Sequence, residues 1–185
     1  TKNVQRLHEV KDSIISGFRW ACRTGPLCEE PLRGVKAELL DAQIHEEPKQ
    51  REPTQIMRAI SRAILGSALT AKPVLLEPIY KVNVSVPNQW FGACSNILTR
   101  RRGKILTTEH RGAISVIVGY IPVSETFGLS AEMRSATSGH AFWQCTFALW
   151  EKTPENIATE VIEQIRRRRG LPAEIPKPEK FIDEA

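Results

Sequence analysis

Metal-binding residues are scarce in this sequence, and they are not spaced as ligands. The four cysteines are Cys22, Cys28, Cys94 and Cys145. They form no Cys-x-x-Cys pair and match no zinc-finger spacing, and the four histidines are scattered singly, without a His-Glu-x-x-His motif. We therefore expect no metal site, and we expect the cysteines to be reduced and mostly buried thiols.

The motifs of the common catalytic sites are also missing. The nearest approach to a phosphate-binding loop is GSALTAK at residues 66–72, which lacks the second glycine and the hydroxyl residue after the lysine. No nucleophile elbow occurs. His45 stands beside Glu46 and Glu47, which fits a polar surface cluster better than a general base. We predict no catalytic residue and no cofactor for this chain.

Long apolar runs are absent as well. No run is long enough to span a bilayer, and no signal peptide opens the sequence. These two absences predict a cytoplasmic protein that does not associate with membranes.

What the sequence does contain is typical of a globular protein. It has 185 residues, of which 41% are apolar and 25% charged, and this length suits one large or two small domains. The formal net charge is +5, and the basic excess lies in the body of the chain rather than in its tail. Such a mild basic balance permits nucleic-acid binding without requiring it.

The first 72 residues predict two helices joined through a strand and a charged turn. Apolar residues at helical spacing indicate a helix over residues 4–23, and alternation indicates a strand over residues 35–44. Residues 45–53, here called the tip loop, hold two prolines among charged side chains and predict an exposed loop. Thr54 is expected to cap the helix that follows.

From residue 73 the pattern changes. Strands are predicted over residues 76–86, 104–109, 113–121 and 142–150, and helices over residues 87–101 and 124–133. The order β-α-β-β-α-β is that of the ferredoxin-like split motif. A last helix follows Thr153-Pro154, and the proline-containing tail after Leu171 is predicted to have no regular structure. The predicted fold class is α+β.

Two clusters of arginine stand at predicted helix ends. Cations are favoured there by unpaired carbonyls, but three consecutive arginines exceed what one helix end needs. The first cluster and its basic neighbours are therefore candidates for phosphate contact: Arg100, Arg101, Arg102, Lys104 and Arg111. The second cluster, Arg166–Arg169, has Glu160 and Glu163 within ion-pairing distance along the helix and is a weaker candidate.

Six segments in one order carry a resemblance over nearly the whole chain. They are GPLCEEPLRGVK (25–36), DAQIHEEPKQREPTQIMRAISR (41–62), TAKPVLLEPIYKV (70–82), TRRRGKI (99–105), IPVSETFG (121–128) and SGHAFWQCTF (138–147). Together they resemble the C-terminal portion of archaeal and eukaryotic elongation factor 2. The resemblance implies part of that family's domain IV over residues 1–72 and its ferredoxin-like domain V over residues 73–152. It also implies that residues 153–185, a helix and a tail, pack back on the first lobe.

The resemblance implies a role in translocation. In the family this region binds the ribosome, with domain V on ribosomal RNA at the factor-binding site and a domain IV finger in the A site, near tRNA and mRNA. GTP and magnesium are bound in the family by a GTPase domain that this sequence does not contain. The implied RNA contacts at the finger are Lys49, Arg51, Arg58 and Arg62, and a monomer is expected.

The tip loop departs from the family's pattern. The family usually has a histidine there, which is converted to diphthamide, followed by arginine and glycine. Gln50 stands at the position of the histidine, Arg51 at that of the arginine and Glu52 at that of the glycine. We therefore expect no diphthamide, and we interpret the sequence as a divergent paralogue.

Several alternatives stay open at this point. The early strands of domain IV are missing, so the sequence is either an excised fragment or a short protein with an exposed edge. A stand-alone ribosome-binding regulator without GTPase activity is one alternative function. The C-terminal part of the spliceosomal relative is another, against which the missing tip histidine weighs. The charges do not favour a third, a ferredoxin-like ligand-binding module.

Overall fold

The computed structural model describes residues 7–182, which divide into two compact units. One unit contains the described residues up to Leu75 together with those from Pro154 onward. The other contains residues Leu76–Thr153. All the strands among the described residues belong to the second unit and form one antiparallel sheet, so the chain has the predicted α+β class.

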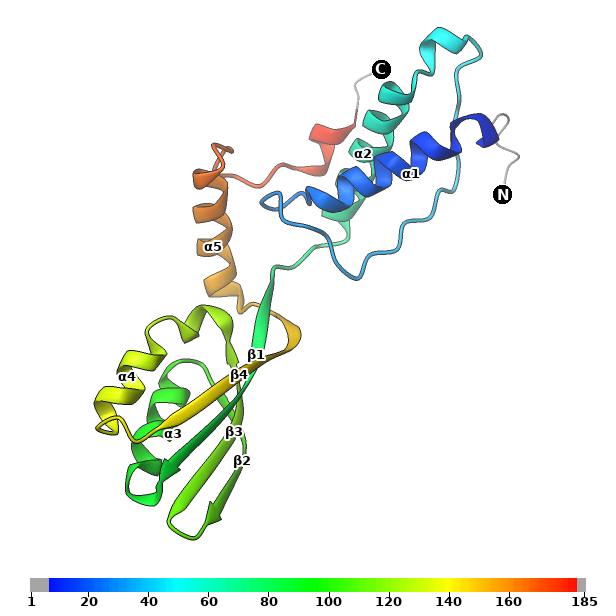
Figure 1. Cartoon of the computed structure of the whole chain (residues 1–185). Helices are drawn as coiled ribbons and strands as arrows, with labels where there is room; N and C mark the ends of the chain where they lie inside the picture. The colour runs from blue at the N-terminus through cyan, green and yellow to red at the C-terminus, as the bar shows by residue number, and fades with distance from the viewer. Residues whose placement is uncertain (1–6, 183–185) are drawn as a thin grey trace. The chain divides into compact units, whose positions relative to one another are not determined.

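The first unit is built on two helices, α1 (Leu7–Arg23) and α2 (Pro53–Thr70), which lie across one another (Figure 1). Val10, Gly17 and Ala21 are the buried positions of α1. A Cβ atom added at Gly17 would lie 2.8 Å from the carbonyl oxygen of Met57, so the glycine lets the two backbones approach closely. The helix predicted from residue 4 is present from Leu7, and residues 4–6 lie outside the described part of the chain.

The strand predicted over residues 35–44 is wrong. This segment has no regular secondary structure, although Val35 and Leu39 alternate with polar residues as expected of a strand. Both of these apolar side chains are exposed. A strand is stabilised by hydrogen bonds to a neighbour, and no described residue pairs with this segment.

The helix start predicted at Thr54 is also wrong. α2 begins at Pro53, and its N-cap residue is Glu52, whose side chain accepts a hydrogen bond from the backbone N–H of Gln55. In return, Gln55 Oε1 accepts one from the backbone N–H of Glu52 at 3.2 Å. This reciprocal pair is a capping box, and the N–H of Gln55 also donates to the backbone carbonyl of Glu52 at 3.0 Å.

The second unit is a four-stranded antiparallel sheet in the order β2-β3-β1-β4. Its strands are β1 (Leu76–Pro87), β2 (Lys104–Arg111), β3 (Ile114–Pro122) and β4 (Phe142–Lys152). Helices α3 (Phe91–Arg100) and α4 (Leu129–Ala136) lie on the same side of the sheet (Figure 1). The β-α-β-β-α-β order and the ferredoxin-like fold predicted from the sequence are confirmed.

The core of the second unit lies between the sheet and its two helices. It consists of Val82, Val84, Val86, Cys94, Ile97, Leu98, Ile117, Ile121, Leu129 and Met133. The helix predicted over residues 124–133 is divided in the structure. A single turn of 3-10 helix, η3 (Val123–Thr126), precedes α4, and Gly128 between them has φ of 75°, which breaks the helix.

The last helix, α5 (Glu155–Arg168), belongs to the first unit. The tail beyond it is largely irregular as predicted, but it contains one 3-10 turn, η4 (Pro178–Phe181), that packs on α2. A Cβ atom added at Gly66 of α2 would lie 3.2 Å from Cβ of Phe181, so this turn sits tightly against the helix.

Candidate nucleic-acid interface

The tip loop presents two exposed polar side chains on one turn of 3-10 helix, η1 (Pro48–Gln50). Its turn is closed by hydrogen bonds from the N–H of Gln50 to the Glu47 carbonyl at 3.1 Å and from the N–H of Glu47 to His45 Nδ1 at 3.1 Å. Lys49 and Gln50 are exposed. The loop therefore displays one cation and one amide, which can hydrogen-bond to phosphate or base edges.

Arg51 has turned inward, although it follows Gln50 directly. Its guanidinium forms an ion pair with Glu9 of α1 at 2.9 Å, and its side chain is only 14% exposed. With the capping box of Glu52, this ion pair fixes the base of the tip loop on both helices. The structure thus gives Arg51 a positioning role within the unit.

The two candidate arginines of α2 also differ. Arg58 is exposed, whereas Arg62 is half-buried and donates a hydrogen bond to the carbonyl of Lys180 in η4 at 3.2 Å. Arg62 therefore holds the tail against α2, and Arg58 remains available at the surface of the same helix.

Arg101 and Arg102 bind other parts of the second unit. Arg101 donates to Glu132 at 2.6 Å and to the carbonyls of Glu125 and Phe127 at 2.7 and 2.9 Å. Arg102 pairs with Glu77 of β1 and lies 3.7 Å from a carboxylate oxygen of Glu125. These bonds connect the end of α3 to β1, η3 and α4. The arginines that end α3 therefore stabilise the unit through residues distant in sequence.

The other three basic candidates remain largely in solvent. The side chains of Arg100, Lys104 and Arg111 are 73%, 66% and 72% exposed. Arg100 pairs with Glu132, Lys104 with Glu151 at 2.8 Å, and Arg111 with Glu109 at 2.6 Å. Exposed ion pairs are worth only about 0–1 kcal/mol, so these cations can exchange a carboxylate for a phosphate at little cost.

Two of the arginines at the end of α5 are structural. Arg166 is buried and donates to the carbonyls of Leu27 and Pro172 at 2.7 and 2.6 Å. Arg169 donates to the carbonyl of Glu29 at 2.8 Å and to the carboxylate of Glu30 at 2.5 Å. These bonds attach α5 to the turn after α1. The sequence showed only the cluster, because its partners after α1 lie about 140 positions away along the chain.

Of the four cysteines, Cys28 and Cys94 are buried and Cys22 and Cys145 are half-buried. Cys22, Cys28, Cys94 and Cys145 are all free, and burial raises the pKa of each. The pKa of Cys145 is raised to about 11. Over residues 7–182 no group of three or more His, Cys, Asp or Glu side chains could hold a metal ion, and no helix there is both long and apolar enough to cross a bilayer.

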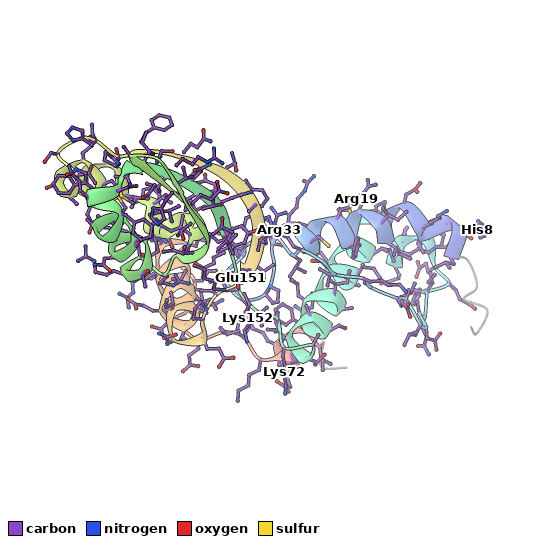
Figure 2. All side chains as sticks on the ribbon, turned by 90° about the horizontal axis from the view of Figure 1, so that it is seen from below. His8, Arg19, Arg33, Lys72, Glu151 and Lys152 are labelled. Atoms are coloured by element: carbon purple, nitrogen blue, oxygen red, sulfur yellow. The ribbon has the colours of Figure 1, made fainter. Side chains whose placement is uncertain are left out.

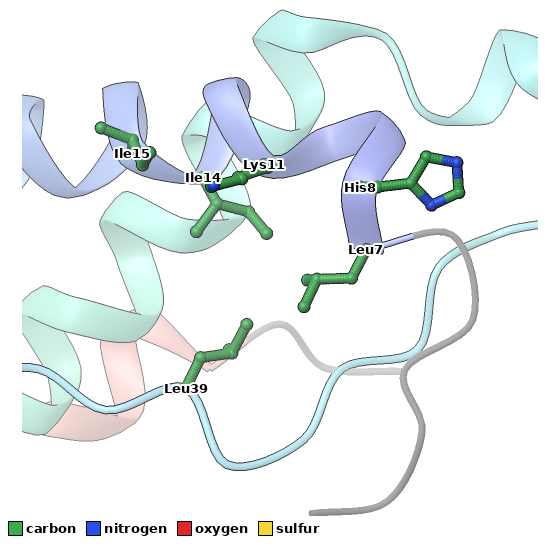
Figure 3. A pocket seen from close by; sticks show the side chains of 6 residues that line it. All are labelled: Leu7, His8, Lys11, Ile14, Ile15 and Leu39. Atoms are coloured by element: carbon green, nitrogen blue, oxygen red, sulfur yellow. The ribbon is translucent and has the colours of Figure 1, made fainter.

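A cavity of about 590 Å³ lies between α1 and the extended segment after it (Figure 3). It is lined by Leu7, His8, Lys11, Ile14, Ile15 and Leu39. Leu39 points toward Leu7 across the space, and the His8 ring is turned away from it. His8 and Arg19 are exposed on α1 (Figure 2). The lining is mainly apolar, and it brings together none of the candidate RNA contacts.

Comparison with known proteins divides the chain at the same place as the pattern of elements. The family described as "Elongation factor G, domain IV" matches residues 1–72, and "Elongation factor G C-terminus" matches residues 74–161. Proteins named elongation factor 2 are similar over almost the whole chain: 47% identical over 184 residues in Korarchaeum cryptofilum, and 47% and 48% over 182 residues in Sulfurisphaera tokodaii and Staphylothermus marinus. The chain matches the C-terminal region of the elongation factor 2 family.

The chain matches only part of the length of these relatives. The alignments cover 98–99% of this chain but only 25% of each of these relatives, in their C-terminal part. The chain is thus a translation elongation factor region of the domain IV and C-terminal type.

Proposed function

We propose that this chain is the ribosome-binding C-terminal region of an elongation factor 2-like translational GTPase and acts in translocation. The first unit would place the tip loop in the A site, near tRNA and mRNA, and the second unit would lie on ribosomal RNA. The observation that carries this proposal is the exposed turn Pro48–Gln50, held at its base by Arg51 and Glu52. A turn fixed in this way can present Lys49 and Gln50 to RNA without a large loss of conformational entropy on binding.

The contacts to RNA phosphates are proposed to come from the exposed cations. These are Lys49 and Arg58 in the first unit and Arg100, Lys104 and Arg111 in the second. Arg51, Arg62, Arg101 and Arg102, also candidates from the sequence, would support binding indirectly by holding those surfaces in place.

Three further features belong to the same proposal. Gln50 offers no imidazole for conversion to diphthamide, so the tip would act unmodified. The sequence has no phosphate-binding loop, and the matched families are domain IV and the C-terminus, so GTP hydrolysis would not reside in this chain. The site of action would be the cytoplasm. The names of the relatives favour a translation factor over the spliceosomal alternative.

Co-sedimentation with purified ribosomes of Sulfurisphaera tokodaii tests the proposal. We expect binding that weakens as salt rises, because cations displace counterions from phosphates. Replacing Arg100, Lys104 and Arg111 by glutamine should lower the log–log salt slope by about two to three units. Absence of binding at low salt would contradict the proposal.

The opposite change provides a matched control. Glu109→Gln and Glu151→Gln remove the carboxylates that compete for Arg111 and Lys104 without touching the cations. The doubly substituted chain should bind ribosomes more tightly than the unchanged chain. Equal weakening by both sets of changes would mean that folding, and not phosphate contact, was measured.

A further inference from the structure

Phe127 is the most exposed aromatic side chain in residues 7–182. It is 77% exposed, compared with 68% for Phe142, the next in order. It lies in the short connection between η3 and α4, directly before Gly128. A large apolar ring held in water contributes nothing to folding by burial, so its position calls for an explanation outside the core.

The backbone that carries this ring is firmly held. Arg101 donates from one nitrogen, Nη1, to the carbonyls of Glu125 and Phe127 at 2.7 and 2.9 Å. The hydroxyl of Thr126 donates to the carbonyl of Val123 at 2.7 Å. Beyond Gly128, Leu129 is fully buried in the core. The loop is thus fixed at both ends while the Phe127 side chain extends into solvent.

The arginines beside this loop are paired with carboxylates, and one of them, Arg100, is largely exposed. Arg101 shares the carboxylate of Glu132 with Arg100, whose side chain is 73% exposed. An exposed aromatic ring flanked by arginine is suited to unpaired nucleotides, because the ring stacks on a base and the guanidinium binds the adjacent phosphate. An apolar pocket of another protein could bury the ring but would offer no partner for the arginine.

We propose that Phe127 stacks on an unpaired base of ribosomal RNA and that Arg101 is the positioning residue that holds its loop. The inference rests on the proposed ribosome binding, and it names a contact that supplies base recognition where the other candidates supply only charge.

The test compares single variants of the whole chain for binding to purified ribosomes of Sulfurisphaera tokodaii. Stacking on one base is lost in Phe127→Ala, and we expect affinity to fall about tenfold. Phe142→Ala removes a similarly exposed ring from β4 and serves as the matched control, with affinity expected to stay within about twofold. Equal affinities for Phe127→Ala and the unchanged chain would overturn the inference while leaving the proposed function standing.

Conservative changes distinguish a base from a protein pocket. Phe127→Trp keeps a stacking surface and should bind within about threefold of the unchanged chain, whereas Phe127→Leu should lose about as much as alanine. Full affinity in the leucine variant would show an apolar protein pocket and overturn the inference. If the unchanged chain does not bind ribosomes at all, the proposed function fails and this inference fails with it.

The role of Arg101 is tested by a double-mutant cycle. Arg101→Lys keeps the charge but cannot bond both carbonyls from one rigid group. If it acts by positioning the ring, its effect on affinity should largely disappear when Phe127 is already alanine. Additive losses would assign Arg101 a separate role and overturn the positioning part. Thermal unfolding of each variant identifies any loss that comes from misfolding.

Discussion

The two units of this molecule are held together in different ways. In the sheet unit, ten buried apolar residues from strands and helices form one core. In the helical unit, the buried positions are fewer and include Gly17, Ser61 and Arg166. Polar bonds join its parts: Arg51 to Glu9, and Arg166 to the carbonyl of Leu27. The sheet unit depends on packing, and the helical unit depends on a few specific side chains.

The largest effect should come from the core of the sheet unit. Leu98→Ala opens a cavity at a fully buried position and should destabilise that unit by about 3 kcal/mol. Hydrogen exchange measured by mass spectrometry should show faster exchange within residues 76–153 and unchanged exchange in α1 and α2. Leu106→Ala, at an exposed position of β2, is the control and should have little effect. Equally faster hydrogen exchange in both units would show that the two units unfold together.

Removal of one polar bond should destabilise the helical unit and leave the sheet unit unchanged. Arg166→Met keeps much of the side-chain volume but leaves the carbonyls of Leu27 and Pro172 without their donor. We expect a loss of about 2 kcal/mol confined to the helical unit. Arg167→Met, at an exposed position one residue later, should be nearly neutral. An unchanged helical unit in the Arg166 variant would contradict the role given to this bond.

A smaller effect is expected at the tip loop. Glu52→Ala removes the cap of α2 and should cost about 1 kcal/mol. Exchange should increase in the first turn of α2, and the affinity for ribosomes should fall with it if the cap positions the tip. Glu47→Ala removes a nearby exposed carboxylate outside the capping box and is the control.

The last effect is absent at neutral pH and is expected only in alkaline solution. Burial raises the pKa of Cys145 from 9.0 to about 11, so the folded state holds this proton more strongly than the unfolded state. Its contribution to stability is complete below pH 9 and is lost as the pH rises toward 11. Urea unfolding of the sheet unit across this range should be less pH-dependent in Cys145→Ala than in the unchanged chain. Parallel curves for the two chains would contradict the assignment.

The sequence predicted the sheet unit well because its signals are local. Strand alternation and the glycine and proline positions marked each element to within a few residues, and the order of elements identified the fold. Residues 35–44 have the same local signal and yet form no strand, since a strand also needs a partner that the described chain does not supply.

The candidate site was predicted less completely. The sequence placed the basic residues correctly on helix ends and on the tip loop. It could not distinguish the side chains that are exposed to solvent from those that are bonded to other groups of the protein. Glu132 lies 31 residues from Arg101, and Glu77 lies 25 residues from Arg102. Pairs so far apart along the chain produce no periodic pattern in the sequence. For the same reason, nothing in the sequence except the glycine that follows it indicated that Phe127 is exposed.

The division of the chain sets the order in which it can fold during synthesis. The sheet unit is continuous, and its two ends are adjacent because Leu76 pairs with Lys152 across β1 and β4. It is therefore an insertion within the helical unit, and its close termini let the outer unit accommodate it. The helical unit lacks α5 and η4 until the insertion has been made. Nascent chains would carry a finished sheet beside an incomplete helical partner, because α2 and the turn after α1 bind η4 and α5, which are synthesised after the sheet.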